Sequence, residues 1–178
     1  MPQLRLTIKM QKELKVIHLQ DPTNNPIRLY DDWYVDIVRI MRRKIFIFMH
    51  INTRVGLAIP SYEIGGAQNL LECFPLYLRE FFSHLNYEEI AIEAYNFFND
   101  PQFEITFTKT DNKSILRHIT TFKNILEFNA QRIGCIDQLL CDKTSEYWLD
   151  YLIKDNFKPN DYTTPLQLIK DLFDKIYN

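Results

Sequence analysis

The sequence is poor in the residues that catalytic and phosphate-binding motifs require. It has four glycines in 178 residues, with neither a glycine-rich phosphate loop nor a Gly-x-Ser-x-Gly nucleophile motif. Its four histidines are scattered, without the HExxH or HxH spacing of metal sites. These absences predict no cofactor and no metal ion. They do not indicate an enzyme, and they do not exclude one.

Cysteines and long apolar runs are scarce as well. Cys73, Cys135 and Cys141 form no CxxC pair and leave one cysteine over, so the sequence predicts reduced thiols rather than a disulfide framework. The longest strongly apolar run, residues 45–51, is far shorter than the roughly 18 residues of a membrane span. The N-terminus lacks the pattern of a secretory signal. Together these features predict a soluble, cytoplasmic protein without a membrane span.

Positive charge is in slight deficit, and the formal net charge is −2. Without a broad positive field, sequence-independent binding to a long nucleic acid is disfavoured. A local basic cluster beside Trp33 and Tyr34 is the exception, because a basic hairpin tip next to aromatic rings can contact phosphates or stack on bases. A solvated turn explains the same residues, which are Arg39, Arg42, Arg43 and Lys44.

The hydrophobic content of 46% and the charged content of 25% are those of a globular protein. Alternating and continuous apolar runs predict an α+β fold, with helices packed against an antiparallel sheet of about five strands and a helical C-terminal tail. We expect a core domain over 1–134 and a helical extension over 135–178, packed on or beside the core. The predicted strands are residues 3–9, 33–40, 44–51, 55–59 and 103–108.

One candidate site lies at the end of the apolar run 45–51, which is predicted to be the central strand, covered on both faces. Because side chains alternate along a strand, His50, Asn52 and Arg54 share a face and can converge on an anionic or planar ligand. Lys109 and Ser114, where a strand passes into a helix, would lie near a bound anion. Two simpler roles fit the same residues: a satisfied, half-buried histidine at position 50, and ordinary helix capping in segment 108–114.

The other candidate site is the aromatic C-terminal region. Tyr147, Trp148 and Tyr151 favour a protein-binding surface, although their spacing of i, i+1 and i+4 fits a buried core equally well. The sequence therefore predicts a non-enzymatic binding or regulatory protein whose partner is another protein. The alternative is a small enzyme or ligand sensor that uses the His50 site.

Several short motifs, spread over roughly residues 3–130, carry a resemblance to a known family. They are Trp33-Tyr34-x-Asp36-Ile37, Arg43-Lys44 with an apolar strand into Asn52-Thr53, and Ile105-Thr106-x-Thr108-Lys109-Thr110 followed by Ser114. By these motifs the chain resembles a family of small uncharacterised bacterial proteins catalogued as a domain of unknown function. It is similar in outline to passenger proteins of insertion elements and plasmids. The resemblance implies an α+β fold and a bacterial or mobile-element setting, and it implies no activity.

The chain departs from this family pattern in two places. Arg117 and His118 stand where small residues are expected after Ser114, and the aromatic tail from residue 144 lies outside the matching motifs.

Overall fold

A five-stranded sheet lies at the centre of the structure, a computed structural model that describes residues 2–23, 28–102, 104–154 and 161–177. The strand order is β4-β3-β2-β1-β5. The strands are β1 (Gln3–Leu6), β2 (Asp32–Ile40), β3 (Arg43–His50), β4 (Gly56–Pro60) and β5 (Thr106–Lys109).

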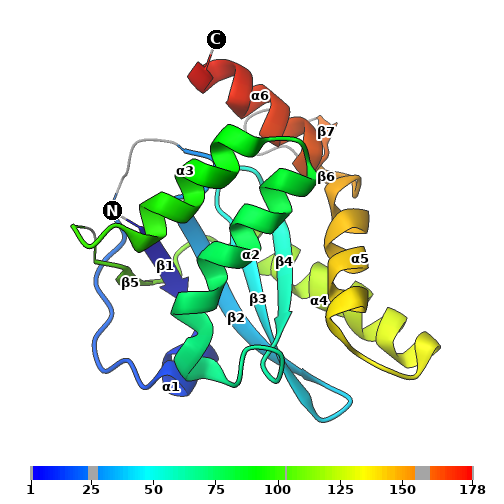
Figure 1. Ribbon diagram of the computed structural model, residues 1–178. Helices are drawn as coiled ribbons and strands as arrows, with labels where there is room; N and C mark the ends of the chain where they lie inside the picture. The colour runs from blue at the N-terminus through cyan, green and yellow to red at the C-terminus, as the bar shows by residue number, and fades with distance from the viewer. Residues whose placement is uncertain (1, 24–27, 103, 155–160, 178) are drawn as a thin grey trace.

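Helices cover both faces of this sheet (Figure 1). Helices α2 (Leu70–His84) and α3 (Glu88–Asn99) pack on one face, and α4 (Lys113–Ile133) and α5 (Gln138–Leu149) pack on the other. The remaining elements are α1 (Ile8–Leu14), the short 3₁₀ helix η1 (Ala67–Asn69), the strand pair β6 (Ile153–Lys154) and β7 (Tyr162–Thr163), and α6 (Pro165–Tyr177). None of the helices in the described ranges is long and apolar enough to cross a membrane.

The expectation of an antiparallel sheet is wrong for half of it. The β2-β3-β4 meander is antiparallel, as its short connections predict, but β1 pairs in parallel with both β2 and β5. Parallel pairing needs a long crossover, and α1 with the segment after it supplies one between β1 and β2. The five-stranded sheet, the packed helices and the C-terminal helix are confirmed, and the sheet is mixed.

Three predicted strands differ from β2, β3 and β4 by one residue at one or both ends, and the other two differ by three residues at one end. The first of these two ends at Leu6, because the Thr7 side chain accepts a hydrogen bond from the Met10 amide and so caps α1. The last begins at Thr106 rather than at residue 103, and Phe103 lies outside the described residues.

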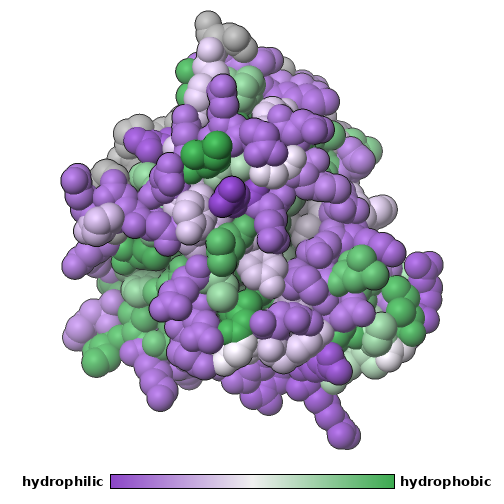
Figure 2. Space-filling model, in the orientation of Figure 1, coloured by the Kyte–Doolittle hydropathy of each residue, from purple (hydrophilic) through white to green (hydrophobic). Residues whose placement is uncertain are grey.

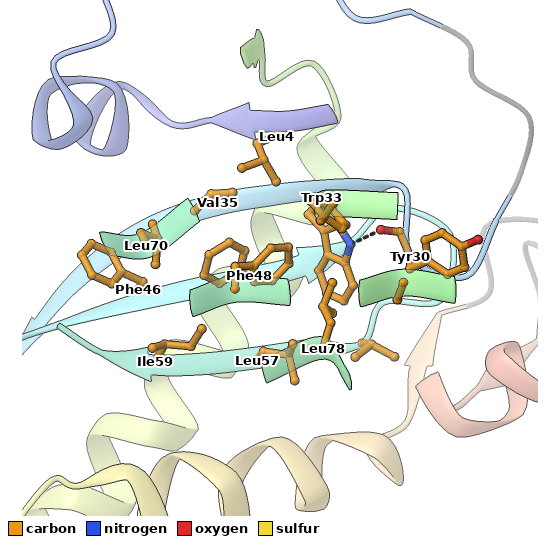
Figure 3. Packing of buried hydrophobic residues seen from close by; sticks show 14 of the residues in the cluster. Leu4, Tyr30, Trp33, Val35, Phe46, Phe48, Leu57, Ile59, Leu70 and Leu78 are labelled. Carbon is orange, nitrogen blue, oxygen red and sulfur yellow. Dashed lines mark hydrogen bonds between the residues drawn. The ribbon is translucent and has the colours of Figure 1, made fainter. Parts of the chain in front are cut away.

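Strand β3 separates two hydrophobic cores. Phe46 and Phe48 face α2 and α3, whereas the alternate residues Ile45, Ile47 and Met49 face α4 and α5, and all five are fully buried. Figure 3 shows Phe46 and Phe48 among side chains of neighbouring strands and α2. The expectation that this strand is covered on both faces is confirmed, although β2 occupies the central position in the sheet.

Candidate functional site

The start of α4 is occupied by a network of the chain's own polar side chains. Arg5, on the α4 side of β1, donates hydrogen bonds of 2.8 and 2.6 Å to the two carboxylate oxygens of Asp32 and one of 2.7 Å to Asp111. The Tyr34 hydroxyl donates to Asp111 and accepts the amide hydrogens of Asp111 and Asn112. Burial opposes ionisation of Asp111, but the hydrogen bonds from Tyr34 and Arg5 hold the pKa of this carboxyl below its ordinary value. An internal carboxylate therefore lies where the sequence suggested an external anion.

The two residues predicted to lie beside that anion have local roles. The Lys109 ammonium lies 2.9 Å from the Asp21 carboxylate. The Asn112 side chain caps α4 by accepting the amide hydrogens of Ser114 and Ile115, at 2.9 and 3.3 Å. Ordinary helix capping, one of the roles that the sequence allowed for segment 108–114, thus accounts for these backbone amides at the start of α4.

His50 is fully buried on the opposite face of the sheet. Its Nδ1 accepts the Thr53 amide hydrogen at 3.2 Å and lies 2.9 Å from the Thr53 hydroxyl, while its ring packs on Trp33 with centroids 5.0 Å apart. Its Nε2 lies 3.7 Å from the Asp31 carboxylate. His50 therefore organises the turn after β3, and strands β2 and β1 separate it from Lys109 on β5.

Arg54 follows that turn with a φ of 59° and is 5% exposed. Its carbonyl accepts the Trp148 indole hydrogen at 2.7 Å, and the His118 ring on α4 lies near the same indole. Asn52, in the turn itself, is half-buried. Arg54 is thus joined to the α4 and α5 layer, whereas His50 faces α2, so the structure does not bring the predicted ligand-binding residues into one pocket.

Burial, with the neighbouring charge of Arg54, lowers the pKa of His118 from 6.5 to about 4. Between these two values the unfolded chain binds a proton that the folded protein does not, so stability falls as the pH decreases through this window. From pH 7 to pH 4.5 we expect the wild type to lose on the order of 2 kcal/mol more stability than His118→Gln. Urea unfolding of both proteins at the two pH values measures the two losses of stability. Equal losses would show that folding does not lower the pKa of His118.

The predicted basic cluster is partly neutralised. Lys44 lies 2.5 Å from the Glu13 carboxylate, and Arg43 stacks over the Tyr62 ring at 4.6 Å and donates to the Ile136 carbonyl. Arg39 and Arg42 remain exposed. Trp33 and Tyr34, the rings proposed to stack on bases, are fully buried. The hairpin therefore presents positive charge, but Trp33 and Tyr34 are not accessible for the base stacking expected of them.

A surface groove runs between α4 and α5, where the aromatic residues of the C-terminal region lie. Its volume is about 630 Å³, and Phe128 and Tyr147 beside it are 63% and 59% exposed. Trp148 is fully buried instead, with Tyr151 stacked on its ring at 4.9 Å. The described residues that line the groove are Thr121, Asn124, Ile125, Phe128, Asn129, Arg132, Tyr147 and Tyr151.

Comparison with known families assigns most of the chain to one domain. The sequence model of the family described as "Domain of unknown function (DUF6933)" matches residues 3–168. The chain belongs to this family. None of the curated proteins compared with it matches. The DUF6933 match includes α4 and α5, so the groove between them lies inside the family domain, together with most of the tail from residue 144.

The face of α4 that lines this groove was not predicted from the sequence. The buried stripe of this helix includes Ile115, Ile119, Phe122 and Leu126. Ile125, Phe128 and Arg132 recur at helical spacing beside that stripe, a signal of a second face with its own contacts. Within the described part of the DUF6933 chain, no three His, Cys, Asp or Glu residues are grouped so as to hold a metal ion.

Proposed function

We propose that this DUF6933 protein is a non-enzymatic binding protein that docks an amphipathic helix of a partner protein in the groove between α4 and α5. The observation that carries the proposal is the exposure of Phe128 and Tyr147, two large aromatic side chains on either helix of one groove. Exposed apolar surface of this kind is costly unless a partner covers it. Aromatic residues also supply most of the affinity in many protein interfaces.

The shape and charge of the groove favour a helix as the occupant. Two neighbouring helices leave a groove between them into which the apolar stripe of a third helix fits. Among the described lining residues Arg132 carries the charge, so a partner helix with one carboxylate opposite Arg132 forms a charge-assisted hydrogen bond there. Asn124 and Asn129 offer amide groups to polar residues at the edge of the partner helix.

The same two helices carry further exposed apolar side chains. Ile133 and Leu139 are 54% and 61% exposed at the end of α4 and in α5. Figure 2 shows hydrophobic surface over this part of the molecule, at the lower right of the view.

The proposal places this interaction in the cytoplasm and in a bacterial mobile-element or host-interaction setting. The alternative, an enzyme or ligand sensor built on His50, Asn52 and Arg54, is less well supported because His50 is fully buried.

Site-specific photocrosslinking in host cells tests the proposed function. A photoreactive phenylalanine analogue replaces Phe128 or Tyr147, and in the control it replaces Ile92, a 52% exposed residue of α3 on the other side of the sheet. We expect one discrete protein adduct from positions 128 and 147 and none from position 92. The same adduct from position 92, adducts with a second copy of this chain alone, or no adduct would contradict the proposal.

The partner identified in this way permits a quantitative test. We expect Phe128→Ser with Tyr147→Ser to weaken its binding by about tenfold or more, since exposed aromatic anchors often contribute over 1 kcal/mol each. Ile92→Ser should leave the Kd unchanged. Near-ultraviolet circular dichroism checks that both variants keep the native fold, and an unchanged Kd in the double variant would reject the groove as the docking site.

A further inference from the structure

A second concave region lies between α2, α5 and the outer edge of β4. Its volume is about 240 Å³, and its interior is largely apolar, with Tyr77 and Phe81 from α2 and Leu149 from α5. Figure 1 shows β4 between these two helices, at the end of the sheet. This pocket is separate from the α4–α5 groove, with which it shares none of its described lining residues.

The contribution of β4 shows that the pocket opens onto the strand edge. Leu57, Ala58 and Ile59 all line it, although the side chains of Leu57 and Ile59 enter one core and that of Ala58 enters the other. Three consecutive residues of a strand line one pocket only where that pocket meets the backbone edge. In the antiparallel ladder alternate residues bond to β3: the Ser61 amide donates to the Lys44 carbonyl, and the Val55 carbonyl accepts the His50 amide hydrogen. Ala58 lies between these positions and directs its N–H and C=O away from β3.

The rim of the pocket is acidic. It carries the carboxylates of Glu80 on α2 and of Asp142 and Glu146 on α5, and its described lining contains no lysine or arginine. His84 is the basic group present, and it already lies 3.3 Å from the Glu146 carboxylate. Glu80 and Asp142 therefore line this apolar pocket from two different helices, and its described lining contains no lysine or arginine to balance them.

The titration of the neighbouring groups agrees with this excess of negative charge. Burial, together with the charges of Glu146 and Asp137, raises the pKa of Asp142 against the opposing hydrogen bond from Gln138. Burial and the charges of Glu63 and Asp142 raise the pKa of Tyr77 to about 12, so its hydroxyl stays neutral. A bound cation would relieve the repulsion at this rim.

We propose that this pocket binds a small organic cation, consisting of an ammonium or guanidinium group on a short apolar chain. The cationic group would bind the Glu80 and Asp142 carboxylates and the chain would pack on Tyr77 and Phe81, where the rings add cation–π attraction. The volume is below the roughly 300–1,000 Å³ of sites for drug-sized ligands. Because α5 packs along β4, a whole peptide strand does not fit beside that edge, which favours a free small molecule as the occupant.

A matched pair of probes tests the proposal on the full chain. Phenethylammonium and its neutral analogue 2-phenylethanol have nearly the same size and differ in charge. We expect the ammonium to bind about tenfold tighter by NMR titration, and the amide shifts to concentrate at Ala58, Tyr77 and Ser145. Equal affinities, shifts located elsewhere, or no binding at millimolar concentrations would overturn the proposal.

Two variants assign the effect to the rim. Asp142→Asn should remove most of the preference for the ammonium, whereas Glu127→Gln, which removes an exposed carboxylate of α4 outside the pocket, should preserve it. The blocked peptide acetyl-Ala-Lys-Ala-amide tests whether the pocket instead binds the ammonium group of a lysine side chain in another protein. Tighter binding of this peptide than of phenethylammonium, or an unchanged preference in Asp142→Asn, would contradict a site for a free small cation.

Discussion

Replacing Arg5 with leucine is expected to lower the free energy of unfolding by about 3–5 kcal/mol, because it leaves a buried carboxylate without its cation. The Arg5 and Asp32 side chains are only 6% and 8% exposed, and they share a two-pronged ion pair. In Arg5→Leu, the described partner that Asp32 keeps is the Gln3 amide, at 3.0 Å. A hydrogen bond from a neutral amide does not compensate a desolvated negative charge.

A second substitution separates this cause from simple loss of packing. Arg5→Leu combined with Asp32→Asn should be more stable than Arg5→Leu alone, since the asparagine removes the charge and its side-chain oxygen still accepts from Gln3. Asp111→Asn is the matched control, because the Asp111 side chain is 54% exposed and such pairs contribute roughly 0–1 kcal/mol. Urea unfolding measures all three variants. Equal losses in Arg5→Leu and Asp111→Asn would show that the Arg5 pair is accessible to water.

The part of the sheet that the sequence predicts is the part with local connections. The β2-β3-β4 meander follows from three apolar runs joined by short turns, and the structure has it. The parallel partners of β1 are not encoded locally, because β5 reaches the sheet only after α2 and α3 have covered one face. The network around Arg5 has the same origin, since Asp111 lies 106 residues away in sequence. Periodicity identifies the strands, and long-range packing decides their neighbours.

The candidate sites show the same limit at the level of side chains. Strand alternation places His50 on the same face as Phe46 and Phe48, but its complete burial depends on Trp33 and on the turn at Thr53. The helical spacing of the C-terminal aromatics left core and surface equally open. In the structure Trp148 is buried against Phe122 of α4 and Gly56 of β4, whereas Tyr147, the preceding residue of α5, is exposed.

Replacing Trp148 with alanine is expected to lower the free energy of unfolding by about 3–5 kcal/mol, the usual loss for a buried tryptophan. Its ring packs edge-on against Phe122 at 5.5 Å and lies against Gly56, where an added Cβ would come 2.9 Å from Phe122 and 3.1 Å from Trp148. Its indole nitrogen donates to the Arg54 carbonyl at 2.7 Å. The variant thus creates a cavity and also leaves a buried carbonyl without its donor.

Adjacent residues provide the control for this prediction. Tyr147→Ala, at a 59% exposed position of the same helix, should change stability by about 0.5 kcal/mol or less, as surface substitutions usually do. Trp148→Phe should fall between the two, because it keeps a ring against Phe122 and loses the bond to Arg54. Thermal and urea unfolding compare the three variants.

If Trp148→Ala unfolds like Tyr147→Ala, the indole is not a core residue, and Trp148 joins Tyr147 as a candidate contact for the partner. If the stabilities differ as expected, loss of binding in a Trp148 variant reports the integrity of α5, and Phe128 and Tyr147 are the positions at which binding can be tested without disturbing the fold.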